Sequence, residues 1–481
     1  MNSNPTHIAL NSLDHHPPPV YANFVLYLRL KPDASPKKVF SVLQGGLKRV
    51  FTQLPWLGGK VHSSSSTSHG GLEIRYDTDG DIHQLSQFKF KELDSDLTYD
   101  DLKETAFHPS TVEDQTLTWA PFFADIDHDP EVFVAQANFI PGVCILTAAI
   151  LHVVSDGTAL NNVFKIWAEN CYDLQLGNMP RKYPQEISDH NLVELIWSKE
   201  IIKNRAQQVP TETWRLLGLD APPNHNPQRT TEEHRDTQLA SAPGPISSMG
   251  EMKACIFYLP PKNIKDLQDE CAEEPGTADV SLNDVICALI WRCLLRARKR
   301  GTEVALDAQV RLDLPFDARP YFPELMPSNY LGNFTMINQA LTPLSSLVGS
   351  TSIGSIARVL REVAGEATPS RIMDAYTMIK TLVKDSHKLE NLKVDGNGLM
   401  ITSFIAFDIA DVNFGEEVFG NGGRPETVRP LMGPITQSFR YCAILPRKQH
   451  GGVEFLANLF DDELDSLLGD EEFIKFAMFV A

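Results

Sequence analysis

His152 and Asp156 stand four residues apart, and their types and spacing could perform acid–base chemistry. They belong to the segment His152-Val-Val-Ser-Asp156-Gly157, directly after an apolar stretch that ends at Leu151. A neutral imidazole can accept a proton from an alcohol or an amine at neutral pH. The segment therefore predicts His152 as a general base, with Asp156 holding the loop that aims it.

Structural interpretations of the same residues stay open beside this one. The chain has 14 histidines, and about one of them is expected by chance to have an aspartate four residues later. A lone histidine at a strand end is more often a structural residue than a catalyst. Asp156 can also cap the helix that is expected to begin at Gly157.

The elements around the pair are predicted to bring it to a cleft. Two strands are expected, Val132–Ile140 and Val143–Leu151, with the turn signal Pro141-Gly142 between them. The second strand is apolar on both faces, which is typical of a central strand. Apolar residues then recur at helical spacing: Leu160, Val163, Phe164, Trp167, Ala168 and Cys171. A histidine between a buried strand and a helix is well placed to project into a cleft.

Two other kinds of chemistry are not favoured. GxSxG is absent, so direct attack by an acceptor on an activated acyl group is preferred over a covalent acyl-enzyme. HExxH and clustered His and Cys residues are absent as well, so no metal is expected.

The composition is that of a folded, acidic chain of 481 residues. Its net charge of −19 argues against nucleic acid as a partner. The longest apolar stretch, Val143–Val154, is too short for a membrane span of about 20 residues. The seven cysteines form no CxxC pair, which indicates buried thiols in a reducing compartment. Since the amino terminus has no basic region followed by an apolar run, we expect no secretory signal and a cytoplasmic location.

A polar segment interrupted by prolines suggests the domain organisation. The prolines are Pro210, Pro222, Pro223, Pro227, Pro243 and Pro245. Such a segment is typical of a crossover between halves. We predict an N-terminal domain of residues 1–202, a linker of residues 203–249 and a C-terminal domain of residues 250–481. Further helices are predicted over Pro36–Gln53, Pro261–Cys271, Leu282–Arg300 and Asp461–Met478, and further strands over Tyr21–Leu30, Lys253–Leu259 and Gly452–Leu459.

An ordered set of motifs, which includes the His152 segment, resembles the BAHD acyltransferase family and more narrowly its fungal trichothecene acetyltransferase-like branch. The resemblance covers nearly the whole chain. Its other motifs are Leu54-Pro55-Trp56-Leu57-Gly58-Gly59-Lys60-Val61, Val280-Ser281-Leu282-Asn283-Asp284, Asp317-Ala318-Arg319, Tyr330-Leu331-Gly332-Asn333, Thr402-Ser403-Phe404 and Asp411-Val412-Asn413-Phe414-Gly415. Each match alone is weak, and their order makes the set specific.

The resemblance implies a mixed α/β fold of two domains, of the chloramphenicol-acetyltransferase type, with a central solvent channel. The family's motif histidine is the general base, which corresponds to His152. Its motif aspartate forms a salt bridge with an arginine, so Asp156 and Gly157 would support the site and Arg319 would be the partner. Thr402 matches a family residue near the acceptor and the developing oxyanion.

Two motifs depart from the family pattern. Of D-F-G-W-G, only Asp411 and Gly415 remain, and we expect them to support a reshaped loop near the coenzyme channel. Phe404 stands where the family often has Trp, so an indole N–H donor is missing. These departures affect the efficiency and the substrate class more than the type of reaction.

The phosphates of coenzyme A require cations or N–H donors. By position and family analogy, Ser281, Arg424 and Lys253 are the candidates. Locally basic regions at Lys253–Lys265, Arg292–Arg300 and Arg424–Arg429 predict a positive channel mouth, although cations at the end of a helix are usually solvated.

The sequence thus predicts an acyl-coenzyme A-dependent O- or N-acyltransferase. Acetyl transfer to a hydroxyl of a secondary metabolite, by a monomer with no nucleic-acid or membrane partner, is the favoured form. The first alternative is a repurposed relative that binds, dehydrates or cyclises a metabolite. A carrier-protein-dependent condensation enzyme is less favoured, because Leu151 stands where such enzymes commonly have a second histidine.

Overall fold

The computed structural model describes residues 6–64, 71–77, 85–201, 211–219, 250–299, 305–381 and 398–481. The chain forms two compact units. The first unit contains residues Met1–Lys203, Asp317–Phe334 and Phe407–Gly433, and the second contains Asn204–Phe316, Thr335–Ala406 and Pro434–Ala481.

This grouping differs from the predicted two-part division in one respect. Two segments of the second half, Asp317–Phe334 and Phe407–Gly433, belong to the first unit. The segment Asp317–Phe334 contains Arg319, whose guanidinium binds Asp156, and the segment Phe407–Gly433 contains a strand of the first unit's sheet. The predicted boundaries at residues 202 and 250 stay a prediction, since most of the linker, residues 203–210 and 220–249, lies outside the described residues.

The first unit is built on a five-stranded sheet in the order β12-β2-β7-β6-β5. The strands are β2 (Tyr21–Arg29), β5 (Phe88–Glu92), β6 (Phe133–Ile140), β7 (Val143–Leu151) and β12 (Thr427–Arg429). As predicted, β6 and β7 pair as an antiparallel hairpin, and every residue of both strands is buried. A smaller sheet has the order β1-β4-β3, formed by Thr6–Ala9, Gly71–Tyr76 and Lys60–Ser64.

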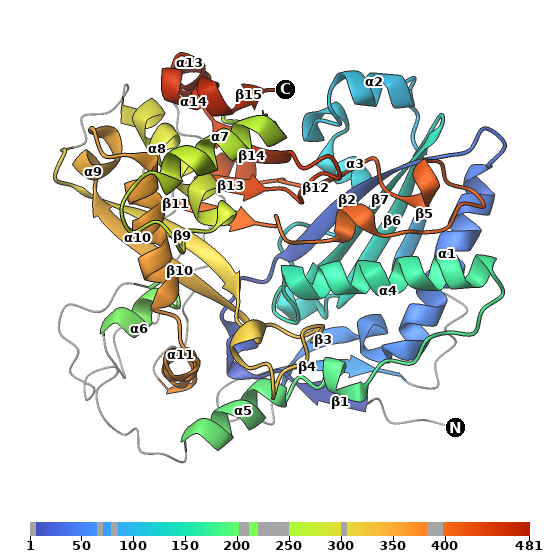
Figure 1. Ribbon diagram of the computed structural model, residues 1–481. Helices are drawn as coiled ribbons and strands as arrows, with labels where there is room; N and C mark the ends of the chain where they lie inside the picture. Colours follow the sequence, from blue (N-terminus) through green and yellow to red (C-terminus); the bar gives the residue numbers. More distant parts are fainter. Residues whose placement is uncertain are drawn as a thin grey trace. The chain divides into compact units, whose positions relative to one another are not determined.

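Two long helices pack against each other beside the five-stranded sheet (Figure 1). They are α1 (Pro36–Gln53) and α4 (Gly157–Gln175). Helix α1 begins after Ser35, whose side chain accepts the Lys38 N–H, and it ends before Pro55. The shorter helices of this unit are α2 (Tyr99–Glu104), α3 (Asp114–Leu117), α5 (Leu192–Ile201), η1 (Ser12–His15), η2 (Pro55–Gly58), η3 (Pro109–Thr111), η4 (Ile126–His128), η5 (Gln185–Ser188), η6 (Arg319–Tyr321), η8 (Ile409–Asp411) and η9 (Asn421–Gly423).

The second unit is built on a seven-stranded mixed sheet in the order β10-β9-β11-β13-β14-β8-β15. The strands are β8 (Lys253–Leu259), β9 (Gln309–Asp317), β10 (Thr335–Pro343), β11 (Gly398–Ser403), β13 (Tyr441–Ile444), β14 (Val453–Leu459) and β15 (Met478–Phe479). The helices are α6 (Thr211–Arg215), α7 (Pro261–Ala272), α8 (Leu282–Lys299), α9 (Leu344–Val348), α10 (Ile353–Gly365), α11 (Pro369–Thr381), α12 (Ile435–Ser438), α13 (Asp461–Leu468) and α14 (Glu471–Phe476).

Helix α8 is the central helix of this unit's core. It contacts α10 and α13, and its side chains from Val285 to Leu295 are buried. A capping box is present at its start, because Ser281 Oγ accepts the Asp284 N–H at 3.2 Å and Asp284 accepts the Ser281 N–H at 2.8 Å. The helix predicted over Asp461–Met478 is instead two helices, α13 and α14, separated at Gly469 and Asp470.

All seven cysteines are buried with free thiols, as the sequence predicted. Among the described residues, no helix combines the length and apolar character that crossing a bilayer requires.

Candidate functional site

His152 is the first residue after β7, and its backbone is held from both sides. Its N–H donates to the Val20 carbonyl oxygen at 2.8 Å. Its own carbonyl oxygen accepts a hydrogen bond from Asn333 Nδ2 at 2.8 Å. The imidazole is half-buried, and its Nδ1 is buried with no hydrogen-bond partner among the described residues.

Asp156 caps α4 and binds Arg319 at the same time. Its Oδ1 accepts the Ala159 N–H at 2.9 Å, so the predicted helix cap is confirmed. Arg319 Nη2 lies 3.0 Å from Oδ1 and 3.1 Å from Oδ2. The two side chains are 1% and 0% exposed. The structure thus contains the pairing that the resemblance implied, and Gly157 follows directly as the first residue of α4.

The ion pair keeps both groups charged although neither contacts water. Burial, the largest influence, acts to raise the pKa of Asp156, but the Arg319 guanidinium and hydrogen bonds from Arg319, Phe334 and Ala159 hold it below its usual value. Burial likewise acts to lower the pKa of Arg319, and the neighbouring carboxylates of Asp156 and Asp317 raise it instead. The pair can therefore fix the loop between His152 and Asp156 without exchanging a proton.

The segment Tyr330–Phe334 is bonded to both ends of that loop. Arg319 donates to the carbonyl oxygens of Tyr330 and Gly332 at 3.0 and 2.6 Å. The Phe334 N–H donates to Asp156 Oδ2 at 2.8 Å, and Ser155 Oγ donates to the Leu331 carbonyl. Since Asn333 also reaches the His152 carbonyl, the loop has little freedom to move relative to this segment.

Asp14 is a buried acid that no sequence pattern indicated. Its Oδ1 accepts a hydrogen bond from Asn333 Nδ2 at 3.1 Å, and its Oδ2 accepts the Asn11 N–H at 2.9 Å. Burial raises the pKa of Asp14 to about 8, in spite of the opposing hydrogen bonds from Asn11 and Asn333. The two partners Asp14 and Asn333 are 319 residues apart, so only the folded chain shows their association.

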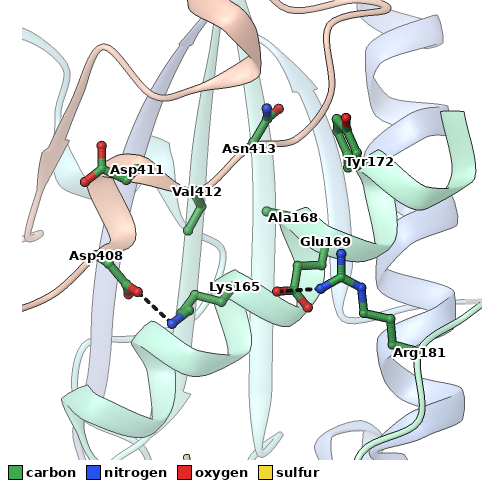
Figure 2. Close-up of a pocket in the computed structure, with 9 residues that line it drawn as sticks. All are labelled: Lys165, Ala168, Glu169, Tyr172, Arg181, Asp408, Asp411, Val412 and Asn413. Atoms are coloured by element: carbon green, nitrogen blue, oxygen red, sulfur yellow. Dashed lines mark ion pairs between the residues drawn. The ribbon is translucent and has the colours of Figure 1, made fainter. Parts of the chain in front are cut away.

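Asp411 lies at a pocket of about 300 Å³ beside α4 (Figure 2). An ion pair borders this pocket on each side, Lys165 with Asp408 at 2.6 Å and Arg181 with Glu169 at 3.0 Å. The other lining residues are Ala168, Tyr172, Asp411, Val412 and Asn413. His152 does not line this pocket.

Gly415 is fixed by the carboxyl end of α4. Gln175 Nε2 donates to the Phe414 carbonyl oxygen at 2.6 Å, and Gln175 Oε1 accepts the Glu417 N–H at 2.9 Å. Gly415 has a φ of +90°, and a Cβ there would lie 2.2 Å from Gln175 Nε2. The two retained family residues, Asp411 and Gly415, thus belong to a loop that is attached to α4.

Thr402 belongs to β11 of the second unit. Its hydroxyl forms a hydrogen bond with the hydroxyl of Tyr441, on the neighbouring parallel strand β13. Burial raises the pKa of Tyr441 to about 12 despite this bond, so the phenol is neutral at neutral pH. The sequence did not indicate Tyr441.

The candidates for binding coenzyme A lie in different surroundings. Ser281 belongs to the capping box of α8, and Lys253 forms an exposed ion pair with Asp461 at 2.7 Å; both are in the second unit. Arg424 is exposed and belongs to the first unit. The structure thus brings His152, Asp156, Gly157 and Arg319 together, and it places Ser281 and Lys253 with different partners.

The predicted excess of positive charge is largely neutralised. Lys262 and Lys265 pair with Asp266 and Asp269. Arg292 and Arg296 both bind Glu472, and Arg429 is buried with its side chain bonded to backbone carbonyls. Of the basic residues named, the exposed Arg424 stays the best candidate for a phosphate, and Arg300 lies outside the described residues.

One group among the described residues could offer three metal ligands, namely Cys293, Asp470 and Glu472. Its carboxylates already face Arg296, which lies 3.6 Å from Asp470 and contacts Glu472. Burial also raises the pKa of the Cys293 thiol well above its usual value. The two carboxylates of this group therefore take part in an ion-pair network with Arg296.

The fold is that of known acyltransferases. The crystal structure of Fusarium sporotrichioides TRI101 complexed with coenzyme A and T-2 matches with a TM-score of 0.75 and 19% identity, over 99% of this chain and 100% of that one. The chain matches the Transferase family over residues 2–474 and belongs to that family, which confirms the BAHD-type resemblance.

Two curated relatives are considerably longer than this chain. The isocyanide synthase-NRPS hybrid crmA of Aspergillus fumigatus is 29% identical over 507 residues, which cover 98% of this chain and 31% of the relative. The enoyl-CoA isomerase/hydratase claC of Penicillium crustosum is 26% identical over 480 residues, which cover 98% of this chain and 51% of the relative. The chain therefore spans about a third and about half of the lengths of these relatives.

Proposed function

We propose that the chain is an acyl-coenzyme A-dependent O- or N-acyltransferase, with His152 as its general base. The observation that carries the proposal is the setting of His152. Its backbone is held at both ends by hydrogen bonds, and the Asp156–Arg319 pair fixes the loop that follows. Membership of the Transferase family, and a structural relative complexed with coenzyme A, support an acyl-coenzyme A co-substrate.

The proposed reaction uses one proton acceptor and no covalent acyl-enzyme. His152 takes the proton from the acceptor's hydroxyl or amine, and the acceptor attacks the thioester carbonyl carbon. The Thr402 hydroxyl would stabilise the tetrahedral oxyanion, oriented by its bond with Tyr441. When the C–S bond breaks, His152 returns the proton to the thiolate of coenzyme A.

The finer features of the proposal rest on the branch of the family. Acetyl-coenzyme A is the proposed donor, and a hydroxyl of a secondary metabolite is the proposed acceptor. Ser281, Lys253 and Arg424 are proposed to contact the coenzyme along a central solvent channel. We further propose that the protein acts as a monomer in the cytoplasm, without a metal and without a nucleic-acid or membrane partner, to which its free buried thiols and acidic charge are suited.

The first prediction concerns His152→Ala. Purified protein is mixed with acetyl-coenzyme A and a panel of alcohols and amines, and release of the free thiol is measured. Removal of the general base is expected to lower kcat by about 100-fold or more, with the affinity for coenzyme A, measured by calorimetry, unchanged. His128→Ala is the matched control, since His128 is an exposed histidine paired with Asp125. Equal turnover by the two variants would show that His152 is not the general base.

A second candidate function is a different reaction in the same fold, such as dehydration or cyclisation of a bound metabolite. Two observations support this second candidate, the relative claC, described as an enoyl-CoA isomerase/hydratase, and the altered Asp411 motif. Binding of coenzyme A in the same calorimetry would exclude a site repurposed for a free metabolite, and a reaction on a coenzyme A thioester is distinguished by its lack of thiol release. Thiol release that requires an acceptor would then identify the transferase.

A further inference from the structure

A buried amide lies between Asp14 and the backbone of His152. Asn333 is 1% exposed and Asp14 is 0% exposed. The two N–H groups of one amide nitrogen are shared, because Asn333 Nδ2 lies 3.1 Å from Asp14 Oδ1 and 2.8 Å from the His152 carbonyl oxygen. The Asn333 side chain thus connects the amino-terminal segment of the chain to the residue proposed as the base.

The Asp14 carboxyl determines which way this amide faces. Both of its neighbours, Asp14 Oδ1 and the His152 carbonyl oxygen, accept hydrogen bonds from the amide nitrogen. A rotated amide would place Asn333 Oδ1 against the His152 carbonyl oxygen, and two acceptors in contact repel each other. With the Asp14 acceptor removed, one of the two interactions that oppose this rotation is lost.

Asp14 itself is held firmly enough to have this effect. The carboxyl accepts the Asn11 N–H at 2.9 Å, and Asn11 Oδ1 accepts the Leu13 N–H at 2.9 Å. These reciprocal bonds form a capping box at the start of η1. The bond from Asp14 to Asn333 therefore begins at a fixed turn.

We propose that Asp14 is a positioning residue for His152, acting through the Asn333 amide on the His152 carbonyl. The inference rests on the proposed function, since it concerns the same base. Asp14 is assigned no contact with the imidazole or with a substrate; it fixes the backbone from which the imidazole extends. Small displacements of a catalytic group are sufficient to lower a rate considerably.

The test compares three substitutions that separate positioning from stability. Asp14→Ala removes the acceptor for Asn333. Asp14→Asn keeps an oxygen for Asn333 but presents N–H to the Asn11 N–H, so it weakens only the cap. Asn11→Ala is the structural control, because it removes the bond to the Leu13 N–H and leaves the Asp14–Asn333 bond in place.

The kinetic readout is thiol release from acetyl-coenzyme A, with the acceptor found in the panel above or with water. Asp14→Ala is expected to lower kcat by about 10-fold with KM for acetyl-coenzyme A unchanged. Asp14→Asn and Asn11→Ala are expected to keep kcat within about two-fold, although each lowers Tm at pH 6. In a His152→Ala background, Asp14→Ala should have no further effect. If Asp14→Ala keeps full kcat while His152→Ala has lost it, the inference is overturned and the proposed function stands.

A spectroscopic readout does not depend on turnover. With ¹⁵N-labelled histidine, the His152 ring resonances are assigned by their absence in His152→Ala. One sharp set is expected in the wild type, in Asp14→Asn and in Asn11→Ala, and a shifted or split set in Asp14→Ala. Identical ring resonances in the wild type and in a folded Asp14→Ala would contradict the inference. Should Asp14→Ala not fold, Asn333→Ala takes its place, because it breaks the same connection at its middle.

Discussion

At the scale of single residues, the burial of the Asp156–Arg319 pair determines what each partner contributes to stability. Each partner is fully buried and satisfied by several hydrogen bonds in addition to the other charge. A buried ion pair contributes little net stability compared with apolar groups of the same shape, but removal of one partner leaves an uncompensated buried charge. Replacing both side chains is thus expected to cost less stability than replacing only one of them.

Arg319→Met is accordingly expected to destabilise the protein by about 3 kcal/mol or more. The double variant Asp156→Asn with Arg319→Met should recover part of that loss, because no charge is then left buried. Urea denaturation of the wild type, both single variants and the double variant measures the coupling. A double variant that is as unstable as the sum of the single variants would show that the two side chains do not act as a pair.

The acid Asp14 predicts an unusual dependence of stability on pH. Burial raises its pKa from 3.8 to about 8, so the folded protein keeps a proton that the unfolded chain has released. Stability from this group is complete below about pH 4 and is lost as the pH rises toward 8 and above. Most buried carboxyls in ion pairs, such as Asp156, have the opposite dependence.

Asp14→Asn should therefore gain stability relative to the wild type as the pH increases. Between pH 6 and pH 8 the difference in unfolding free energy is expected to shift in favour of the variant by about 1 to 3 kcal/mol. Guanidinium denaturation at both pH values measures it. A constant difference would mean that Asp14 does not retain its proton in the folded state.

At the scale of elements, the loop of residues 408–417 is attached along α4 by polar contacts. Asn161 near the start of the helix and Lys165 in its middle bind Asp408, and Gln175 binds the loop backbone at its end. Gly415 is required by this attachment for two reasons, its positive φ and the closeness of Gln175. The loop therefore keeps its place although three of the five family motif residues have changed.

Gly415→Ala should destabilise the protein more than Gly142→Ala. Both glycines have positive φ, +90° and +79°, but a Cβ at Gly142 meets nothing within 4 Å. The control variant should lose about 1 kcal/mol from backbone strain alone, and the Gly415 variant should lose at least about 1 kcal/mol more from overpacking. Tm values of the two variants measure the difference, and equal losses would show that Gln175 moves aside freely.

Local elements were predictable because their signals are local. The apolar spacing of α1, and the continuous apolar run of β7 with the turn before it, gave bounds that agree with the structure, at Pro36–Gln53 and Val143–Leu151. The His152 segment was predictable for the same reason, as was the capping role of Asp156. The break between α13 and α14, at Gly469 and Asp470, was missed, because the acidic residues on both sides of it are compatible with one helix or with two.

At the scale of the whole molecule, the long-range parts of the site could not be predicted from periodicity. The Asp14–Asn333 and Gln175–Phe414 contacts join residues 319 and 239 positions apart. The Arg319–Asp156 pair was expected only because the motifs resemble a family, and neither spacing nor composition indicated it. Net charge was also a poor guide, since ion pairs neutralise most of the basic regions that the sequence singled out.

The strand β12 has a consequence for how the chain can be made. Residues Thr427–Arg429 form the edge of the first sheet beside β2. The Arg429 side chain donates hydrogen bonds to the carbonyl oxygens of Ala106 and Phe107. During synthesis from the amino terminus, the β2 edge is available more than 390 residues before its partner leaves the ribosome, a span given by their positions. Nascent chains must therefore spend that interval with an open sheet edge and with Asp156 unpaired until Arg319 emerges. If the two halves are expressed as separate polypeptides, the first half lacks both β12 and Arg319. We expect the first half to become protease-resistant only when the second half is present.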